Sequence, residues 1–239
     1  MAPAARFSPI EEENLILDAA AKCIRNSSLL DFKMSEIAAE AGISMGSVYK
    51  HVRSKEDVLI ALATRVITHS QVVMSKLMAL PLSAPERLIC TTLFNPIKIQ
   101  SETFAIHLEM MISNQALLQR SSPRWLEKLT MLDHSMQQIF IDSLLYDKDL
   151  LAEGAKRAEL IEELMVGLWS MHVGFLQVVL HRSALHFGKP AKDLPFPLDL
   201  DHSLVRNAKL LINAYPWAKP LKKSGMRKAL NELEKLGYR

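Results

Sequence analysis

The chain has 239 residues, a formal net charge of +3 and only two cysteines, Cys23 and Cys90. A chain of this length buries on the order of 70% of its unfolded surface, either as one large domain or as two modest ones. The two isolated cysteines exclude a disulfide framework and a cysteine-based metal site, and the net charge alone is too small to indicate nucleic-acid binding.

The N-terminal stretch, MAPAARFSPIEEEN, lacks an apolar core after its charge, and no uninterrupted apolar run approaches ~18 residues along the chain. We therefore expect no membrane segment and a cytoplasmic protein. Ser8, Pro9 and Glu11 are typical of a helix start, where the Ser and Glu side chains satisfy free backbone N–H groups. Apolar residues at helical spacing then predict a first helix of about 16 to 19 residues.

Residues 34 to 55, MSEIAAEAGISMGSVYKHVRSK, show the pattern of two short helices joined by a tight turn. Gly42 stands where the first helix must end with positive φ, a conformation that glycine adopts without a Cβ clash. Ser44 follows as the candidate cap of the second helix. Ile37 and Val48 supply the apolar contact between the two helices. This pattern predicts a helix-turn-helix.

The second helix is expected to direct polar and basic side chains outward. Ser and Lys bond base edges or phosphates, Met contacts a thymine methyl group, and Gly lets a backbone approach closely. Residues 41 to 55 contain no acid, although residues 1 to 70 hold eight basic against nine acidic side chains. The alternative is a helical hairpin without this function, which shows similar residues at this spacing. The outward candidates are Met45, Gly46, Ser47, Tyr49, Lys50 and His51.

The stretch IAAEAGISMGSVYKHVRSKEDVLIALA resembles the N-terminal signature of the tetracycline-repressor (TetR) family of bacterial regulators. The matching positions are Ile37 and Ala38, Ala41 to Ser44, Tyr49, and Ser54 to Glu56. The resemblance implies an all-α fold, with an N-terminal three-helix helix-turn-helix DNA-binding domain joined to a C-terminal helical ligand-binding and dimerisation domain. It also implies phosphate contacts from Tyr49 and Lys55. The candidates for base edges are Ser44, Met45, Ser47 and Lys50.

Three positions depart from the family pattern. Ser28 replaces a usual Gly, Lys33 replaces the usual Ser or Thr cap of the second helix, and Val52 replaces a common Phe. Val52 keeps its position apolar. Because Lys33 cannot cap as a hydroxyl does, we expect Ser35 to cap a shorter helix instead.

The remaining chain reads as helices with almost no strand signals. Ser54 opens a long helix that runs to Pro81 and links the N-terminal domain to the body. Further helices are predicted for about residues 83 to 94, 99 to 119, 122 to 145, 156 to 184 and 199 to 215, with the Pro-rich segment KPAKDLPFP before the last. We divide the chain into a DNA-binding domain (1–53), a helical regulatory and dimerisation domain (54–215) and a basic C-terminal extension (216–239).

Residues 160 to 179 are apolar beyond a single stripe, as expected of a helix that faces both its own core and a partner. One recognition helix covers only a few base pairs, so such proteins pair to read two half-sites about 34 Å apart. The resemblance implies a homodimer joined through the last two body helices. The alternative is a helix fully buried in its own monomer.

A pocket for a small-molecule effector is implied by the resemblance, but the residues only hint at it. The body helices carry side chains suited to a mostly apolar cavity with a few polar groups. Each, taken singly, is better explained as a core or surface residue than as a ligand contact, so no ligand-binding residue is assigned. The side chains considered are His107, Met110, Met111, Asn114, His134, Trp169 and His172.

From Pro216 the tail holds seven basic side chains against Glu232 and Glu234. Met226, Leu230 and Leu233 add an apolar stripe, so we expect a short helix docked on the body with its basic face in water. The alternative is contact with DNA or an acidic surface.

An enzyme is the main rival class. The sequence shows no Gly-rich phosphate loop, Ser elbow or His-Glu metal pair, so we expect no catalytic residue, metal or cofactor. The sequence thus predicts a homodimeric TetR-like transcriptional regulator, a repressor, that binds a palindromic double-stranded DNA operator and releases it on binding an effector. The alternatives are a helical adaptor without DNA binding and an activator of the same fold.

Overall fold

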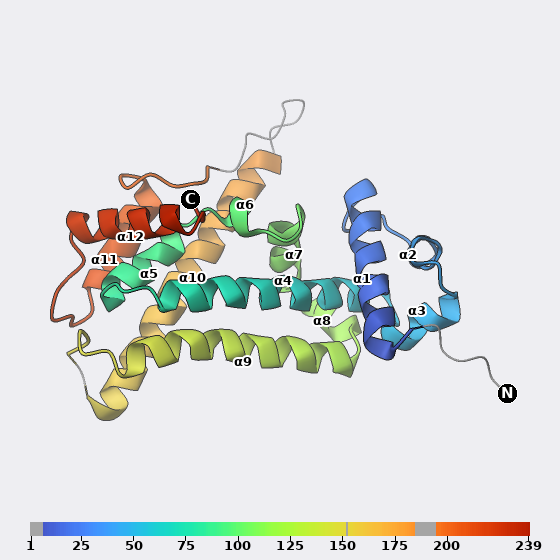
Figure 1. Cartoon of the computed structure of the whole chain (residues 1–239), viewed down its shortest axis with the longest axis horizontal. Helices are drawn as coiled ribbons and strands as arrows, with labels where there is room; N and C mark the ends of the chain where they lie inside the picture. The colour runs from blue at the N-terminus through green and yellow to red at the C-terminus, as the bar shows by residue number, and fades with distance from the viewer. Residues whose placement is uncertain (1–6, 152, 185–194) are drawn as a thin grey trace. The chain divides into compact units, whose positions relative to one another are not determined.

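The computed structural model describes residues 7–151, 153–184 and 195–239. In these ranges the chain forms twelve α-helices and no strand (Figure 1). The predicted all-α fold class is confirmed. Packing divides the chain into two compact units, one containing residues up to 69 together with 101–133, and the other containing residues 70–100 and 134–239. Residues 1–6 of the N-terminal stretch and residues 189–194 of the Pro-rich segment lie outside the described ranges.

Four helices begin the chain: α1 (Pro9–Asn26), α2 (Met34–Ala41), α3 (Met45–His51) and α4 (Lys55–Met78). The predicted capping of α1 is confirmed. Ser8 N–H donates to Glu11 Oε2 (2.8 Å), and Glu11 N–H donates to Ser8 Oγ (3.3 Å). This reciprocal pair satisfies two backbone donors that the first turn of the helix leaves free.

The start of α2 differs from the expectation that Ser35 caps it. The helix begins at Met34, which places Ser35 inside the first turn. Glu36 Oε2 instead accepts a hydrogen bond from the Lys33 N–H (3.3 Å). A carboxylate at this end also interacts favourably with the helix dipole, so an acid in the first turn replaces the missing hydroxyl.

The region from 99 to 119, expected to be one helix, is divided, and that prediction is wrong. Its segments are α6 (Pro96–Ile99), α7 (Ala105–Met111) and α8 (Gln115–Arg120). Gln100 ends α6 in an extended conformation. Asn114 Oδ1 accepts a hydrogen bond from the Ala116 N–H (2.9 Å) and starts α8. Asparagine favours such caps over helix interiors because its side chain competes for nearby backbone groups.

The core of the first unit contains more than the three N-terminal helices. Phe32, Ile37 and Val48 are fully buried in it, and so is Trp125 from the start of α9 (Pro123–Leu145). Leu108 of α7 joins the same cluster. A segment far along the chain therefore completes the core on which the helix-turn-helix rests.

The second unit is built on α5 (Ala84–Leu93), α10 (Gly154–Ala184), α11 (Ser203–Asn213) and α12 (Lys223–Lys235). Figure 1 shows α12 in red alongside the green α5, and buried Met226 and Leu233 of α12 belong to the core of this unit. The tail thus forms the docked helix expected from its sequence. The helix predicted from residue 199 starts later, because His202 Nδ1 accepts from the Leu204 N–H (3.2 Å) and begins α11 there.

In the part of the chain that the structure describes, two helices have the length and composition of membrane spans. They are α4 and residues Lys156–Arg182 of α10, with mean hydropathies of 1.4 and 1.5. Occasional charges interrupt both, so a search for uninterrupted apolar runs passes over them. Half of the α4 window is buried inside the fold, which is the ordinary state of a core helix, whereas only 11% of the α10 window is buried. Length and composition alone are weak evidence for a membrane.

Candidate nucleic-acid interface

The turn between α2 and α3 has the predicted geometry. Gly42 adopts the left-handed conformation at φ 65°, and the following Ile43 N–H donates back to Ala38 O (3.2 Å). Ser44 Oγ accepts a hydrogen bond from the Ser47 N–H (3.1 Å) and caps α3. Gly42 ends α2 and Ser44 starts α3, so local backbone interactions set the direction in which α3 leaves the turn.

The outward face of α3 carries most of the side chains that the sequence proposed for DNA contact. Tyr49 is 46% exposed, and Lys50 and Gly46 are also exposed. Ser47 is half-buried, and Met45 is partly buried against the core of the first unit. This face can donate hydrogen bonds and carries positive charge.

His51 lies differently from the outward position expected of it. Only 9% of its side chain is exposed, and its Nε2 lies 3.0 Å from Glu12 Oε2 on α1. A hydrogen bond to His51 lowers the pKa of the Glu12 carboxyl. The ring therefore belongs to the packing of α3 on α1.

Lys55 begins α4 and is held in place by the loop before α2. Its Nζ donates to Leu30 O (3.2 Å) and lies 5.0 Å from the centre of the Phe32 ring. These contacts fix a cation beside the N-terminal end of a helix, where backbone N–H groups also favour an anion. Ser28, a departure from the family pattern, stabilises the same loop, because its Oγ accepts from the Asp31 N–H (3.1 Å).

Two buried side chains form hydrogen bonds with the backbone at the C-terminal end of α3, and the sequence pattern predicts neither of them. Trp125 Nε1 donates to His51 O (2.9 Å). Asp57, only 1% exposed, accepts from the Arg53 N–H through Oδ2 (2.9 Å) and from the Ser122 N–H through Oδ1 (2.6 Å). In sequence Asp57 has the pattern of an ordinary first-turn acid, and nothing local connects it to a segment 65 residues away.

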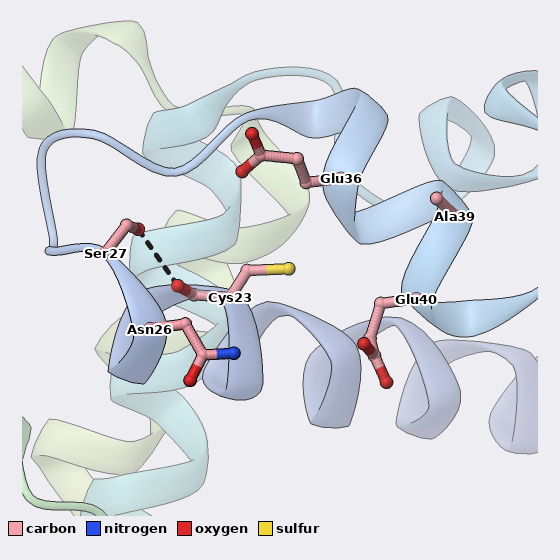
Figure 2. Close-up of a pocket in the computed structure, with 6 residues that line it drawn as sticks. All are labelled: Cys23, Asn26, Ser27, Glu36, Ala39 and Glu40. Carbon is pink, nitrogen blue, oxygen red and sulfur yellow. Dashed lines mark hydrogen bonds between the residues drawn. The ribbon is translucent and has the colours of Figure 1, made fainter.

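Figure 2 shows a polar hollow on the first unit, between α1 and α2. Burial raises the pKa of the Cys23 thiol, and the Glu36 and Glu40 carboxylates raise it further, so the thiol stays protonated at neutral pH. Carboxylates repel phosphates, and the lining lacks the apolar character of an effector cavity. Among the described residues no three metal-ligating side chains cluster. The hollow is lined by Cys23, Asn26, Ser27, Glu36, Ala39 and Glu40.

Several side chains considered for an effector pocket have other roles or face solvent. The Asn114 side chain caps α8, and Trp169 is 67% exposed. His172 Nε2 lies 2.8 Å from Thr92 Oγ1, and burial lowers the pKa of this imidazole to about 4. His172 is therefore a neutral group packed in the second unit at physiological pH.

Large apolar side chains of α10 and of its neighbour α11 are 48 to 69% exposed, while Ile161, Leu164 and Leu168 of the same α10 are buried in the core. Gly167 permits a close approach of α11, since a Cβ there would lie 3.1 Å from Leu211 Cδ2. Val166 and Trp169 are one turn apart and share an exposed face of α10. Val178 lies on another side of the same helix, and Leu210 is exposed on α11.

Two short helices joined at Gly42, the second capped by Ser44 and directing Tyr49 and Lys50 outward, define a helix-turn-helix protein. Residues 16–62, which contain all of this geometry, match the family model described as bacterial regulatory proteins, tetR family. The chain therefore carries the N-terminal domain of the TetR family, and the resemblance stated from the sequence is confirmed.

No curated protein sequence matches the chain significantly. Among solved structures, a protein described as a TetR-family transcriptional regulator from Mesorhizobium loti is similar with a TM-score of 0.55 and 14% identity, over 88% of this chain and 100% of its own. FadR from Bacillus subtilis, solved with stearoyl-CoA, is similar with a TM-score of 0.47 and 17% identity, over 83% of this chain and 94% of its own. GusR from Salmonella enterica is similar with a TM-score of 0.47 and 18% identity, over 97% of each chain. The likeness to the Mesorhizobium protein supports the fold alone.

Proposed function

We propose that this protein regulates transcription by placing α3 in the major groove of double-stranded DNA. The observation that carries this proposal is the outward face of α3, where Tyr49 and Lys50 are exposed and the helix itself carries no acid. Lys and Ser donate to base edges and phosphates, and the Ser44 hydroxyl can still donate while its oxygen caps the helix. The proposed contact residues are Ser44, Met45, Gly46, Ser47, Tyr49, Lys50 and Lys55.

The proposed active form is a homodimer on a palindromic operator. A single α3 of seven residues reads too few base pairs for specific binding, so two copies must read two half-sites. The exposed apolar side chains of α10 and α11 support this proposal, because covering them with a second copy removes apolar area from water and lowers the free energy. Residues 54–215 would then carry dimerisation, and residues 1–53 DNA reading.

Repression and effector-controlled release are the remaining parts of the proposal, and the family resemblance favours both. A ligand releases DNA only if it binds the free conformation more tightly than the DNA-bound one. Because α4 and α9 each have residues in both compact units, a change in the second unit has two continuous helices through which to act on the first. Such a regulator works in the cytoplasm, where the DNA is.

Selection of fragments from the source genome tests DNA recognition directly. We expect the bound fragments to share a two-fold symmetric sequence with half-sites about one helical turn apart. A Lys50→Glu variant should lose the enrichment, whereas Lys148→Glu, which reverses an exposed charge in the second unit, should keep it. Fragments without any shared sequence in the wild type would contradict the proposal and favour the helical adaptor.

A further inference from the structure

Trp125 binds the last turn of the helix that we propose to read DNA. The final carbonyl groups of a helix have no partner within it. One of them, His51 O, accepts the Trp125 Nε1–H at 2.9 Å, and the indole ring is fully buried. Trp125 lies in the first turn of α9, so this bond joins α9 to the end of α3.

The Asp57 carboxylate makes a second connection at the same place. Its two oxygens accept from Arg53 N–H, in the turn after α3, and from Ser122 N–H, just before α9. Hydrogen bonds to an ionised carboxylate are shorter and stronger than those between neutral groups. Because Asp57 is almost completely buried, water cannot easily replace either partner.

Charged side chains hold the start of α9 against α1 as well. Arg124 and Lys128 flank the Trp125 ring, at 5.1 and 4.5 Å from its centre, and both pair with Glu13. Burial raises the pKa of Glu13, but the two cations outweigh it and lower the pKa overall. The ring is thus fixed by hydrogen bonding on one edge and by cations near its face.

We infer that Trp125 and Asp57 are positioning residues that order the C-terminal end of α3 before DNA arrives. This inference rests on the proposed function. Isolated helices shorter than roughly 12 residues are marginal in water, so the seven-residue α3 depends on tertiary contacts for its order. A binding surface that is already ordered avoids the entropy cost of becoming ordered on binding.

A matched pair of tryptophan variants separates positioning from general stability. Trp125→Phe removes the N–H donor and keeps an aromatic ring. Trp217→Phe makes the same deletion in the second unit, where Nε1 of the buried indole donates to Ile212 O (2.6 Å). We expect amide hydrogens of residues 48–53 to exchange roughly tenfold faster in Trp125→Phe only, since one buried hydrogen bond is worth about that factor.

Binding measurements add the functional readout. At equal folded fraction, Trp125→Phe should lower the affinity for a selected operator roughly tenfold, and its affinity for random duplex DNA should change less than about twofold. Trp217→Phe should change neither affinity. If the wild type selects no sequence, the proposed function fails, and hydrogen exchange still tests the positioning role. Equal exchange and equal binding in the two variants would overturn the inference.

A second variant keeps the test decisive if Trp125→Phe does not fold. Asp57→Asn preserves the shape of the side chain but turns one acceptor into an N–H₂ group that faces a backbone donor. We expect faster exchange at Arg53 or Ser122 and the same selective loss of operator affinity. Slow exchange at both amides together with unchanged operator affinity would remove Asp57 from the positioning role.

Discussion

The glycine at the turn of the helix-turn-helix is required for its backbone conformation and not for space. No atom lies within 4 Å of a Cβ built on Gly42, whose φ is +65°. Gly42→Ala should therefore destabilise the fold by roughly 1 to 2 kcal/mol, the cost of the left-handed conformation, while Gly42→Asn should cost less because Asn tolerates it. Urea unfolding measures both, and an alanine variant as stable as wild type would contradict this account.

Substitution of Gly46 by alanine should have the opposite effect on stability, because Gly46 lies inside α3 with an ordinary helical backbone. Gly46→Ala should stabilise the fold by up to about 1 kcal/mol through helix propensity. If the DNA backbone or a base approaches this exposed position closely, the added methyl group should nevertheless weaken operator binding. Urea unfolding and operator titration measure the two effects. A variant that is both more stable and equally tight would remove Gly46 from the interface.

Lys55 tests the phosphate contacts. Removing one phosphate contact flattens the dependence of log K on log salt by about 0.9, so Lys55→Ala should flatten this slope by roughly 2 per dimer. The slope for Lys148→Ala, an exposed lysine of the second unit, should equal that of wild type. Because Lys55 also bonds Leu30 O, unfolding measurements must accompany the titration. An unchanged slope would place Lys55 outside the interface.

The neutral, partly buried His172 should make the stability of the fold depend on pH. Its pKa is lowered by burial to about 4, whereas the unfolded imidazole takes up a proton below about 6.5. The stability that this group contributes is complete above pH 6.5 and is lost as the pH falls towards 4, on the order of 3 kcal/mol in total. His172→Asn should lack this loss when free energies of unfolding are compared across the same pH range.

Glu109 changes stability with pH in the opposite direction to His172. It is present in both the wild type and the His172→Asn variant. Burial raises its pKa to about 7 from 4.5, so its contribution to stability is present at low pH and is lost as the pH rises through 7. Subtracting the His172→Asn curve from the wild-type curve cancels this part. A flat difference between pH 4 and 6.5 would show that the pKa of His172 is the same in the folded and unfolded states.

The residues that the sequence identified correctly are those whose roles are local. Gly42 and Ser44 act on backbone groups within four residues of themselves, and their spacing alone predicts both roles. His51 and Asp57 could not be placed in this way, because their surroundings include Glu12 and Ser122 from distant segments. Helical spacing predicts which direction a side chain takes, but not what packs against it.

At the scale of elements, α12 is an integral part of the second unit. Leu233 is fully buried in its core, whereas Leu236 at the end of the helix is 39% exposed. Leu233→Ala should lower the free energy of unfolding by about 2 to 5 kcal/mol, and Leu236→Ala should change it by less than about 0.5 kcal/mol. Chemical denaturation measures this matched pair. Equal, small effects would mean that α12 is an appended tail.

Helix boundaries are predictable where a strong local signal starts or ends them. The Ser83 and Glu86 side chains, and the Asn95-Pro96 pair, fix both ends of α5 as expected. The prediction of one helix over 99–119 is wrong because apolar residues continue at helical spacing through that region. Asn114 fits the pattern as a polar member of a helix, although it lies between α7 and α8 and caps the start of α8. Composition cannot distinguish these two roles of asparagine.

At the scale of the whole molecule, contacts between segments that are distant in sequence define the two compact units, and local sequence patterns do not predict such contacts. The first unit takes in residues 101–133 in addition to the helix-turn-helix. Trp125 explains why, because a fully buried tryptophan contributes a large apolar area to the core around Ile37 and Val48. The helical class, by contrast, follows from spacing and caps alone.

The proposed dimer requires that exposed apolar side chains of α10 become buried against the second copy. Trp169 is 67% exposed on α10, and Tyr146 is 82% exposed elsewhere in the second unit. Trp169→Glu would place a charge where a partner must exclude water, which costs several kcal/mol without an opposing charge. We expect sedimentation to give a dimer for wild type and for Tyr146→Glu, and a monomer with weak operator binding for Trp169→Glu. A Trp169→Glu protein that stays dimeric would show that another surface joins the two copies.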